Sequence, residues 1–350
     1  MWQIIGHNRA VSLLQRSLER GALSHAYVFT GPSHVGKMTL ALNLAQALNC
    51  SADERPCGKC SSCQKITAGN HADVQVIGLT RNGESAEAKL ISIDQIRNMQ
   101  HSASLPPFEG NYKIFIIEGA EFLSTEAANC LLKTLEEPAD RVIIILLTTN
   151  ERLLPATVVS RCQRLEMPPV PFTEIEAALN SQYSLNPPKA TLLARLSHGC
   201  PGWAFTAAQD DSLLEQHAAK IDRLLEIVNA DYDERFAYAN QLATQFTHNR
   251  ALVHETLDLW LEFWRDLLLD GIGCTDIITN IDRLDTLTEM AGDYTPARIK
   301  AFIDSIQAAG EQLRQNANPR LVLEVLMLDT PGKERRSAKN PAAQLSARHG

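Results

Sequence analysis

Residues 31–37, Gly-Pro-Ser-His-Val-Gly-Lys, have the glycine and lysine spacing of a Walker A loop. In such a loop, backbone N–H groups and the start of the following helix point toward a phosphate, and the lysine adds a positive charge. The surroundings fit this interpretation, because residues 27–29 are typical of a short buried strand and residues 39–47 have the apolar spacing of a helix. The candidate nucleotide-binding residues here are Gly31, Pro32, Ser33, His34, Val35, Gly36, Lys37, Met38 and Thr39.

Two side chains that a working ATPase needs are missing near this loop. The residue after Lys37 is Met38 rather than serine or threonine, and a thioether is a poor ligand for Mg²⁺. The strand predicted at residues 113–118 ends in Glu118-Gly119, where a pair of carboxylates is expected. Glu118 could still reach a metal ion, but no general base follows it. We therefore expect the isolated chain to hydrolyse ATP negligibly.

A third candidate side chain, Asn150, follows the strand predicted at residues 141–149. Ligands on parallel sheets bind outside the carboxyl ends of the strands, so we expect the loop, Glu118 and Asn150 to converge on one site. Whether ATP binds there stays open at this point. Lys37 could contact a phosphate, or it could be kept as a structural cation among the carbonyl groups of the loop.

Four of the eight cysteines cluster with the spacing C-x6-C-x2-C-x2-C. Cysteines that lie two residues apart can bind one tetrahedral Zn²⁺ from a tight turn, so we expect a structural zinc module at residues 50–63. Four protein ligands would leave no open position for catalysis. The alternative is a group of four reduced cysteines at the surface. The predicted ligands are Cys50, Cys57, Cys60 and Cys63.

Strands and helices alternate in the first half of the chain, which predicts a parallel sheet with helices on both faces. After the proline-rich linker at residues 168–171 the strand patterns stop, and helical patterns run to residue 329. The expected fold class is an α/β P-loop domain with an inserted zinc module, followed by a small helical lid and a C-terminal all-α domain. The predicted boundaries are 1–167, 168–208 and 209–330, with a disordered tail at 331–350.

Composition narrows the class of protein. The net charge of −8 argues against a chain that coats nucleic acid with its whole surface, although a local basic patch stays open. No apolar run approaches the ~18 residues of a membrane-spanning helix. The N-terminus also lacks the charged and apolar regions of a signal peptide. We expect a cytoplasmic protein without membrane contact.

Several segments together resemble the bacterial DNA polymerase III clamp-loader subunits, which are AAA+ proteins. The resemblance covers residues 1–205 and, more faintly, the C-terminal helices. It is carried by residues 24–27 (Ser-His-Ala-Tyr), the Walker A loop, the four-cysteine module, residues 69–73 (Gly-Asn-His-Ala-Asp), residues 129–138 (Asn-Cys-Leu-Leu-Lys-Thr-Leu-Glu-Glu-Pro) and residues 160–162 (Ser-Arg-Cys).

The resemblance implies a heteropentameric ring with gamma/tau-type and delta-type subunits, which loads the sliding clamp onto primer-template DNA. It also implies a collar, or oligomerisation, role for residues 209–330. Met38, Gly119 and Gly202 depart from the ATP-hydrolysing gamma/tau pattern and favour the delta-prime type, which is similar in fold but acts as a rigid stator. Arg161 matches the arginine that the family presents in trans to the ATP of a neighbouring subunit, an arginine finger.

Two alternatives stay open from the sequence. The chain could be a gamma/tau-like subunit that hydrolyses ATP itself, or a zinc-dependent module that binds nucleic acid. The acidic net charge counts against the second alternative. So does the composition of the cysteine segment, whose cations are Arg55, Lys59 and Lys65 alone.

Overall fold

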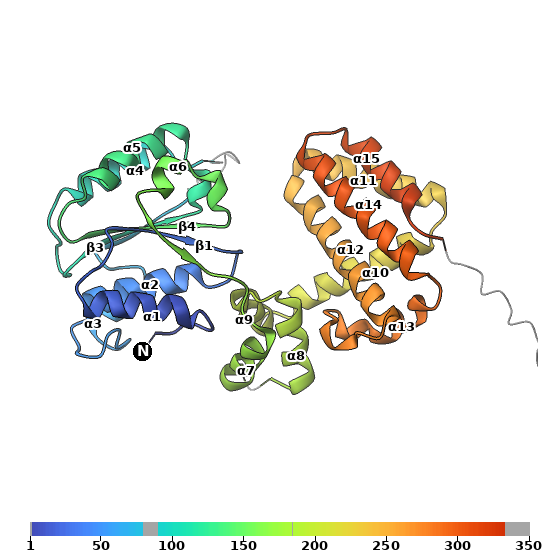
Figure 1. Ribbon diagram of the computed structural model, residues 1–350, viewed down its shortest axis with the longest axis horizontal. Coiled ribbons are helices and arrows are strands. Elements are labelled where there is room, and N and C mark those ends of the chain that lie inside the picture. Colours follow the sequence, from blue (N-terminus) through green and yellow to red (C-terminus); the bar gives the residue numbers. More distant parts are fainter. Residues whose placement is uncertain (1, 80–89, 184, 333–350) are drawn as a thin grey trace, which may run out of the picture. The chain divides into compact units, whose positions relative to one another are not determined.

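The computed structural model describes residues 2–79, 90–183 and 185–332 (Figure 1). Of the predicted disordered tail, residues 331–350, only the first two residues are described and the rest lies outside the described residues. Contacts divide the chain into two compact units, Met1–Thr206 and Ala207–Gly350. The separate lid predicted at residues 168–208 stays a prediction.

The first unit contains a sheet of five parallel strands in the order β2-β3-β4-β1-β5. The expected α/β fold class is confirmed, and each predicted strand forms with its ends moved by no more than one residue. The strands are β1 (Ala26–Thr30), β2 (Val74–Ile77), β3 (Lys113–Glu118), β4 (Val142–Thr148) and β5 (Gln163–Glu166).

Helices cover both faces of this sheet, which explains why its central strands are apolar at nearly every position. Successive residues of β1 point to opposite faces, so Tyr27 and Phe29 join one core and Val28 joins the other. In Figure 1, α1 (Asn8–Glu19), α2 (Lys37–Asn49) and α3 (Ser61–Thr67) lie on one side of the sheet. The other side is covered by α4 (Ile93–Ala103), α5 (Thr125–Glu136) and α6 (Ala156–Val159).

Strand register brings the carboxyl ends of the central strands to one edge. Thr30 of β1 is paired with Thr148 of β4, and Glu118 of β3 is paired with Leu147 of β4. Two short 3₁₀ helices follow these ends, η1 (Ala120–Phe122) after β3 and η2 (Glu151–Leu153) after β4. The loop after β1 therefore lies beside the end of β4, whose other neighbour is the end of β3.

Three further helices follow the sheet, α7 (Phe172–Tyr183), α8 (Pro187–Leu196) and α9 (Pro201–Gln209). Asn186 caps α8 by accepting the N–H of Lys189, and the proline at the next position suits the first helical turn. At the start of α9, the N–H of Gly202 donates to the carbonyl of His34 over 2.9 Å. This bond ties α9 to the candidate phosphate loop.

The second unit is helical, as expected. Its core is built around Trp260 and Trp264, which are fully buried on α12, and Trp264 packs edge-to-face against Phe302 with ring centroids 4.8 Å apart. The helices are α10 (Ser212–Asn229), α11 (Tyr232–His248), α12 (Arg250–Gly271), α13 (Leu284–Ala291), α14 (Pro296–Arg314) and α15 (Pro319–Asp329), with 3₁₀ helices η3 (Thr275–Ile277) and η4 (Ile281–Arg283).

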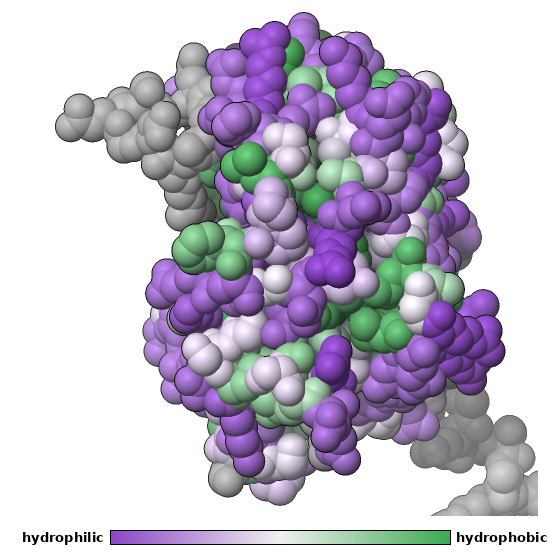
Figure 2. Space-filling model, turned by 90° about the vertical axis from the view of Figure 1, so that its left-hand side faces the viewer, coloured by the Kyte–Doolittle hydropathy of each residue, from purple (hydrophilic) through white to green (hydrophobic). Residues whose placement is uncertain are grey.

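The surface is mainly hydrophilic on the side drawn in Figure 2, where apolar side chains form small separate groups. None of the helices in the described parts of the chain has the length and apolar character to cross a membrane. Most apolar side chains of the strands are enclosed in the two cores that flank the sheet, although Val76 of β2 is exposed.

Candidate functional site

The loop between β1 and α2 has a backbone that needs glycine at both ends. A Cβ atom on Gly31 would lie 2.1 Å from the carbonyl oxygen of Met167, so no other residue fits there. Gly36 has φ 110° and ψ 14° where it caps α2, a conformation that side-chain-bearing residues rarely adopt. The Walker A glycines of the sequence therefore have a structural cause in this chain.

Lys37 contacts the loop itself. Its Nζ atom donates to the carbonyl oxygens of Gly31 and Pro32, each over 2.6 Å. Burial lowers the pKa of Lys37, while the nearby carboxylate of Glu121 acts in the opposite direction. In this arrangement the ammonium closes the loop on its own carbonyl groups.

A pocket of about 430 Å³ lies at the edge of the sheet where β3 and β4 end. Asn150 does not line it, because its side chain turns back and accepts the N–H of Arg152. Gly31 and Pro32 are also outside the lining, and Val35 is fully buried beneath the loop. The candidate residues that line the pocket are Ser33, His34, Gly36, Lys37, Met38, Thr39 and Glu118.

Gly119 lacks a side chain that could act as a base, and its backbone conformation also favours glycine. Its φ is 68°, and a Cβ atom there would lie 2.8 Å from Cδ2 of Phe122, whose ring also lines the pocket. The place where a catalytic carboxylate is expected is therefore shaped for glycine and partly filled by an aromatic ring.

Glu121 lies in η1, directly after β3, and the sequence pattern did not single it out. Its Oε1 atom accepts the N–H of Thr149 over 3.0 Å and the Thr149 hydroxyl over 2.6 Å. Burial alone would raise the pKa of Glu121, but these hydrogen bonds outweigh it and hold the pKa below the usual range. Through Oε1 the carboxylate thus links the segment after β3 to the end of β4, whereas its Oε2 atom is buried and has no hydrogen-bond partner among the described residues.

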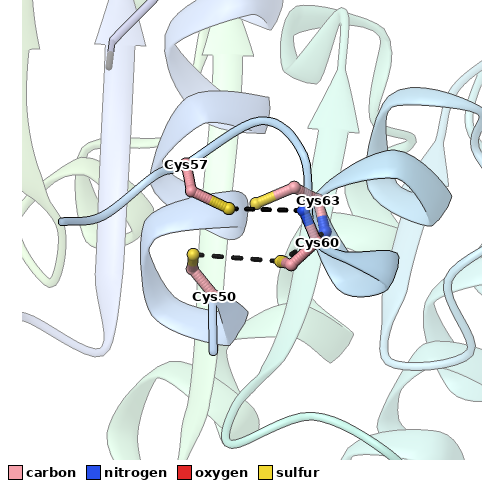
Figure 3. Close-up of side chains that lie close together, drawn as sticks. All are labelled: Cys50, Cys57, Cys60 and Cys63. Carbon is pink, nitrogen blue, oxygen red and sulfur yellow. Dashed lines mark hydrogen bonds between the residues drawn. The ribbon is translucent and has the colours of Figure 1, made fainter. Parts of the chain in front are cut away.

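The four predicted metal ligands come together, as expected from their spacing. Their sulfur atoms all lie within 4.8 Å of one another, and Sγ of Cys50 and Sγ of Cys60 are 3.9 Å apart (Figure 3). Cys50 ends α2, while Cys57, Cys60 and Cys63 come from the turn before α3 and from its first turn. The cluster could hold a metal ion.

Backbone donors already favour the thiolate form within this cluster. The N–H of Cys60 donates to Sγ of Cys57 over 3.3 Å, and the N–H of Cys63 donates to Sγ of Cys60 over 3.5 Å. For Cys60, backbone hydrogen bonds from Cys63 and Ser51, together with hydrogen bonds from neighbouring cysteines, outweigh burial and lower the pKa to about 6. Burial raises the pKa of Cys63 to about 12. Hydrogen bonds from the backbone thus favour the thiolate at Cys57 and Cys60, whereas burial favours the protonated thiol at Cys63.

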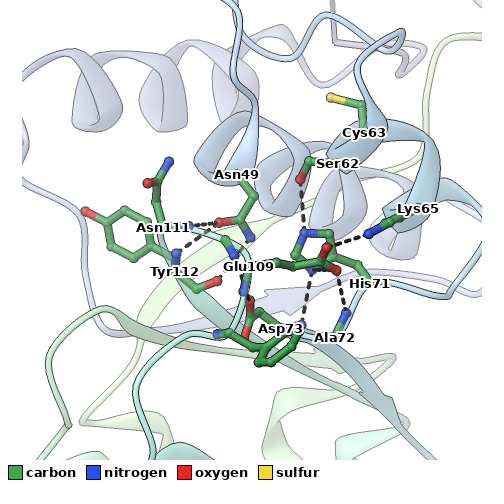
Figure 4. Close-up of polar contacts among 12 residues, drawn as sticks. Asn49, Ser62, Cys63, Lys65, His71, Ala72, Asp73, Glu109, Asn111 and Tyr112 are labelled. Atoms are coloured by element: carbon green, nitrogen blue, oxygen red, sulfur yellow. Dashed lines mark hydrogen bonds and ion pairs between the residues drawn. The ribbon is translucent and has the colours of Figure 1, made fainter.

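A polar network joins the cysteine module to the sheet (Figure 4). The carboxylate of Asp73 accepts the N–H groups of Phe108, Glu109 and Gly110 over 2.7–2.8 Å. Glu109 in turn pairs with Lys65 of α3, and buried His71 contacts the hydroxyl of Ser62 over 3.0 Å. The module is therefore fixed to the loop that enters β3.

Arg161 lies just beyond α6, away from the pocket lining. Its Nη2 atom lies 2.7 Å from Oε1 of Glu136 at the end of α5. Its Nη1 atom donates to the carbonyl of Thr157 over 2.9 Å. The side chain remains 37% exposed. The guanidinium is thus held in a defined place at the surface of the first unit.

Comparison with known proteins identifies the family. The model described as DNA polymerase III, delta subunit, matches residues 6–171, and the model for its C-terminal region matches residues 212–330. The chain is 30% identical over 321 residues to DNA polymerase III subunit delta' of Bacillus subtilis, covering 91% of this chain and 94% of that protein. The chain belongs to the DNA polymerase III delta' family.

This chain is also similar to a tau subunit. The chain is 25% identical to DNA polymerase III subunit tau of Bacillus subtilis over 346 residues, which is 93% of this chain but 60% of that tau subunit. A solved DNA polymerase III gamma subunit-related protein from Thermotoga maritima is 18% identical, with a TM-score of 0.39 over 91% of this chain and 98% of that one. Two features of the first unit bear on the function of this delta' family member. They are the pocket beside Lys37 and the ion pair at Arg161.

Proposed function

We propose that this delta' family member is the stator of a DNA polymerase III clamp loader. In this role it forms a heteropentameric ring with gamma/tau-type and delta-type subunits, which loads the sliding clamp onto primer-template DNA in the cytoplasm. Residues 168–208 act as its lid, and residues 209–330 form its part of the collar. Arg161 contacts the ATP of the adjacent gamma/tau-type subunit.

One observation carries this proposal. Arg161 is anchored by Glu136 and by the Thr157 carbonyl yet is partly exposed, while Gly119 leaves the chain's own pocket without a base. A guanidinium keeps its charge at any relevant pH and can contact two phosphate oxygens at once. It can therefore stabilise the transition state in a neighbour's site without chemistry in its own subunit.

The chain's own pocket supports binding better than hydrolysis. Met38 offers no hydroxyl to Mg²⁺, and Gly119 offers no carboxylate to activate water. Any nucleotide phosphate must also compete with the Gly31 and Pro32 carbonyls for Lys37. We propose an ATP site that is degenerate and does not turn over.

We further propose that the cysteine cluster binds one structural Zn²⁺. Four sulfur atoms at Zn–S distances of about 2.3 Å in a tetrahedron lie about 3.8 Å from one another. The 3.9 Å between Cys50 and Cys60 agrees with this spacing. With four thiolates the site would be closed to substrate, so its role would be to hold α3 and the end of α2 together.

The experiment is reconstitution with gamma/tau-type and delta-type subunits, followed by measurement of DNA-stimulated ATPase and clamp loading. Arg161→Ala should leave ring assembly intact and lower both rates. An arginine finger supplied in trans raises the hydrolysis rate at one site by about 10³–10⁵-fold. A ring with other active sites would lose only the part of its total rate that this site contributes. Arg161→Lys should restore little, because an ammonium cannot make the bidentate contact.

Arg164→Ala is the matched control. Arg164 is also a partly exposed arginine that pairs with a glutamate, at 2.7 Å from Glu151, but lies on β5 three residues further on. Rings with Arg161→Ala that load clamps at the wild-type rate would refute the finger assignment. If the isolated chain instead turns over ATP at about 1 s⁻¹ or faster, the gamma/tau-like alternative is correct.

A further inference from the structure

Helix α1 presents three arginines on one face. Arg9, Arg16 and Arg20 are all exposed. Their spacing of seven and four residues places them within about 40° of one another around a helix of 3.6 residues per turn. At about 1.5 Å per residue they extend over roughly 16 Å. We call these three side chains the α1 arginine row.

The rest of the helix explains why the row faces outward. Ala10 and Leu14 are buried in the core that α1 shares with α2, beside which it lies on the same side of the sheet (Figure 1). An amphipathic helix that buries one face must turn the opposite face to solvent. The row lines a groove of about 590 Å³ together with the polar side chains of Asn8, Ser12 and Ser17 and the apolar side chains of Leu13 and Ala22.

The α1 arginine row differs from three exposed arginines of the second unit in having no acidic partner among the described residues. Within residues 2–79, 90–183 and 185–332, none of the three guanidinium groups takes part in an ion pair or hydrogen bond. By contrast, three exposed arginines of the second unit each pair with a glutamate on their own helix. These are Arg223, Arg314 and Arg320, which lie 2.7–3.2 Å from Glu226, Glu311 and Glu324.

We infer that the α1 arginine row binds the phosphate backbone of nucleic acid. Arginine matches phosphate oxygens with two parallel N–H donors, and hydroxyl and amide side chains are common additional phosphate donors. A docking site for an acidic protein would also need an exposed aromatic or aliphatic anchor. No large exposed hydrophobic side chain lies on α1 within the described residues.

This contact would be local, because the chain as a whole carries a net charge of −8. It would also be independent of base sequence, since backbone contacts position nucleic acid without reading it. The inference goes beyond the proposed ring role by giving this chain its own DNA contact. It is tested on the isolated chain, whereas the ring role is tested on the reconstituted ring. Either proposal can therefore fail while the other stands.

The test is fluorescence anisotropy of the full chain with a labelled primer-template duplex, between about 50 and 200 mM salt. Three phosphate contacts predict a slope of log K against log [salt] of about −2.7 on duplex DNA, which is a loss of roughly 40-fold over this range. The variant with Arg9→Gln, Arg16→Gln and Arg20→Gln should bind at least ~10-fold more weakly at the low-salt end, with a slope near zero. A second duplex of unrelated sequence should give the same result.

The control variant carries Arg223→Gln, Arg314→Gln and Arg320→Gln, which changes the net charge equally. It should bind as the wild type does, and thermal unfolding should show that both variants are folded. Equal loss in both variants, or no DNA binding by the wild type, would overturn the inference. So would binding that survives the α1 substitutions but disappears when a chelator removes metal, because that result assigns DNA to the cysteine module. An α1 variant that keeps the wild-type DNA affinity but no longer assembles with gamma/tau-type and delta-type subunits in a separate reconstitution would overturn the inference and assign the row to a protein contact.

Discussion

Arg161 and Glu136 form an ion pair between two segments that are 25 residues apart in the chain. The Nη2 atom of Arg161 lies 2.7 Å from Oε1 of Glu136, and the same guanidinium donates to the Thr157 carbonyl. Exposed ion pairs contribute little to stability, about 0–1 kcal/mol. We therefore expect this ion pair to matter because it positions the guanidinium of Arg161, rather than because it stabilises the fold.

Glu136→Gln should reduce the DNA-stimulated ATPase of the reconstituted ring. A glutamine can still accept one hydrogen bond but lacks the charge that fixes Arg161, so we expect a loss of about 3- to 10-fold at the affected site. The loss should appear in kcat rather than in the KM for ATP, and unfolding temperature should be unchanged. Glu136→Asp should recover part of the rate. A ring with Glu136→Gln that matches the wild type would mean that Arg161 needs no positioning partner.

Restoring the missing side chains should not restore hydrolysis. The double variant Met38→Thr, Gly119→Glu supplies a hydroxyl and a carboxylate, but residue 119 has φ 68° and a Cβ atom there meets Phe122. Left-handed backbone and this contact together should destabilise the chain by about 1–3 kcal/mol. The measurements are ATP turnover and chemical denaturation, with Met38→Thr alone as the control. Turnover at an ordinary rate in the double variant would contradict this account of the pocket.

The cysteine cluster should contain one zinc ion per chain. Elemental analysis of protein purified without chelator should give a 1:1 ratio, and Cys60→Ser should lower it. Because metal binding to such a site contributes directly to folding, chelation should lower the unfolding temperature of the wild type. Cys274→Ser, at an exposed cysteine outside the cluster, is the control and should behave as the wild type. Fully metal-free protein with an unchanged unfolding temperature would exclude the zinc assignment.

Asp73 should make stability depend on acid pH. Burial would raise the pKa of Asp73, but the N–H groups of Phe108, Glu109 and Gly110 outweigh it, so the pKa lies below the usual value. A carboxyl whose folded pKa is lowered stabilises the protein above its unfolded pKa of about 3.9 and loses that contribution as pH falls through the folded value.

The matching variant is Asp73→Asn. Hydrogen bonds to a charged group are worth about 1.5–3 kcal/mol each, so this variant should be clearly less stable at pH 7. The difference from wild type should shrink as pH falls below about 4. Urea denaturation at several pH values measures this, with Asp94→Asn, an exposed carboxyl on α4, as the control. A difference that stays constant down to pH 2 would show that Asp73 is not held as a carboxylate.

Much of this protein followed from the sequence alone. The continuous apolar runs of β3 and β4 fixed two central parallel strands, because a strand buried on both faces has no polar positions. The spacing of the four cysteines placed their sulfur atoms together, since ligands two residues apart share one turn. The Walker A spacing of residues 31–37 also predicted a strand, a loop and a helix in succession, which are β1, the loop and α2. These are local patterns, in which neighbours in the chain are neighbours in space.

The tertiary structure decided what these elements do to one another. The residue types left open whether Lys37 would contact the carbonyls of its own loop. They did not reveal that Phe122 would pack against Gly119 or that Glu121 would engage Thr149. Nor did they pair Arg161 with Glu136. Such contacts depend on strand register and on how each turn folds back, which periodicity does not encode. The sequence therefore determined which groups reach the edge of the sheet, and the packing determined which of them are already engaged.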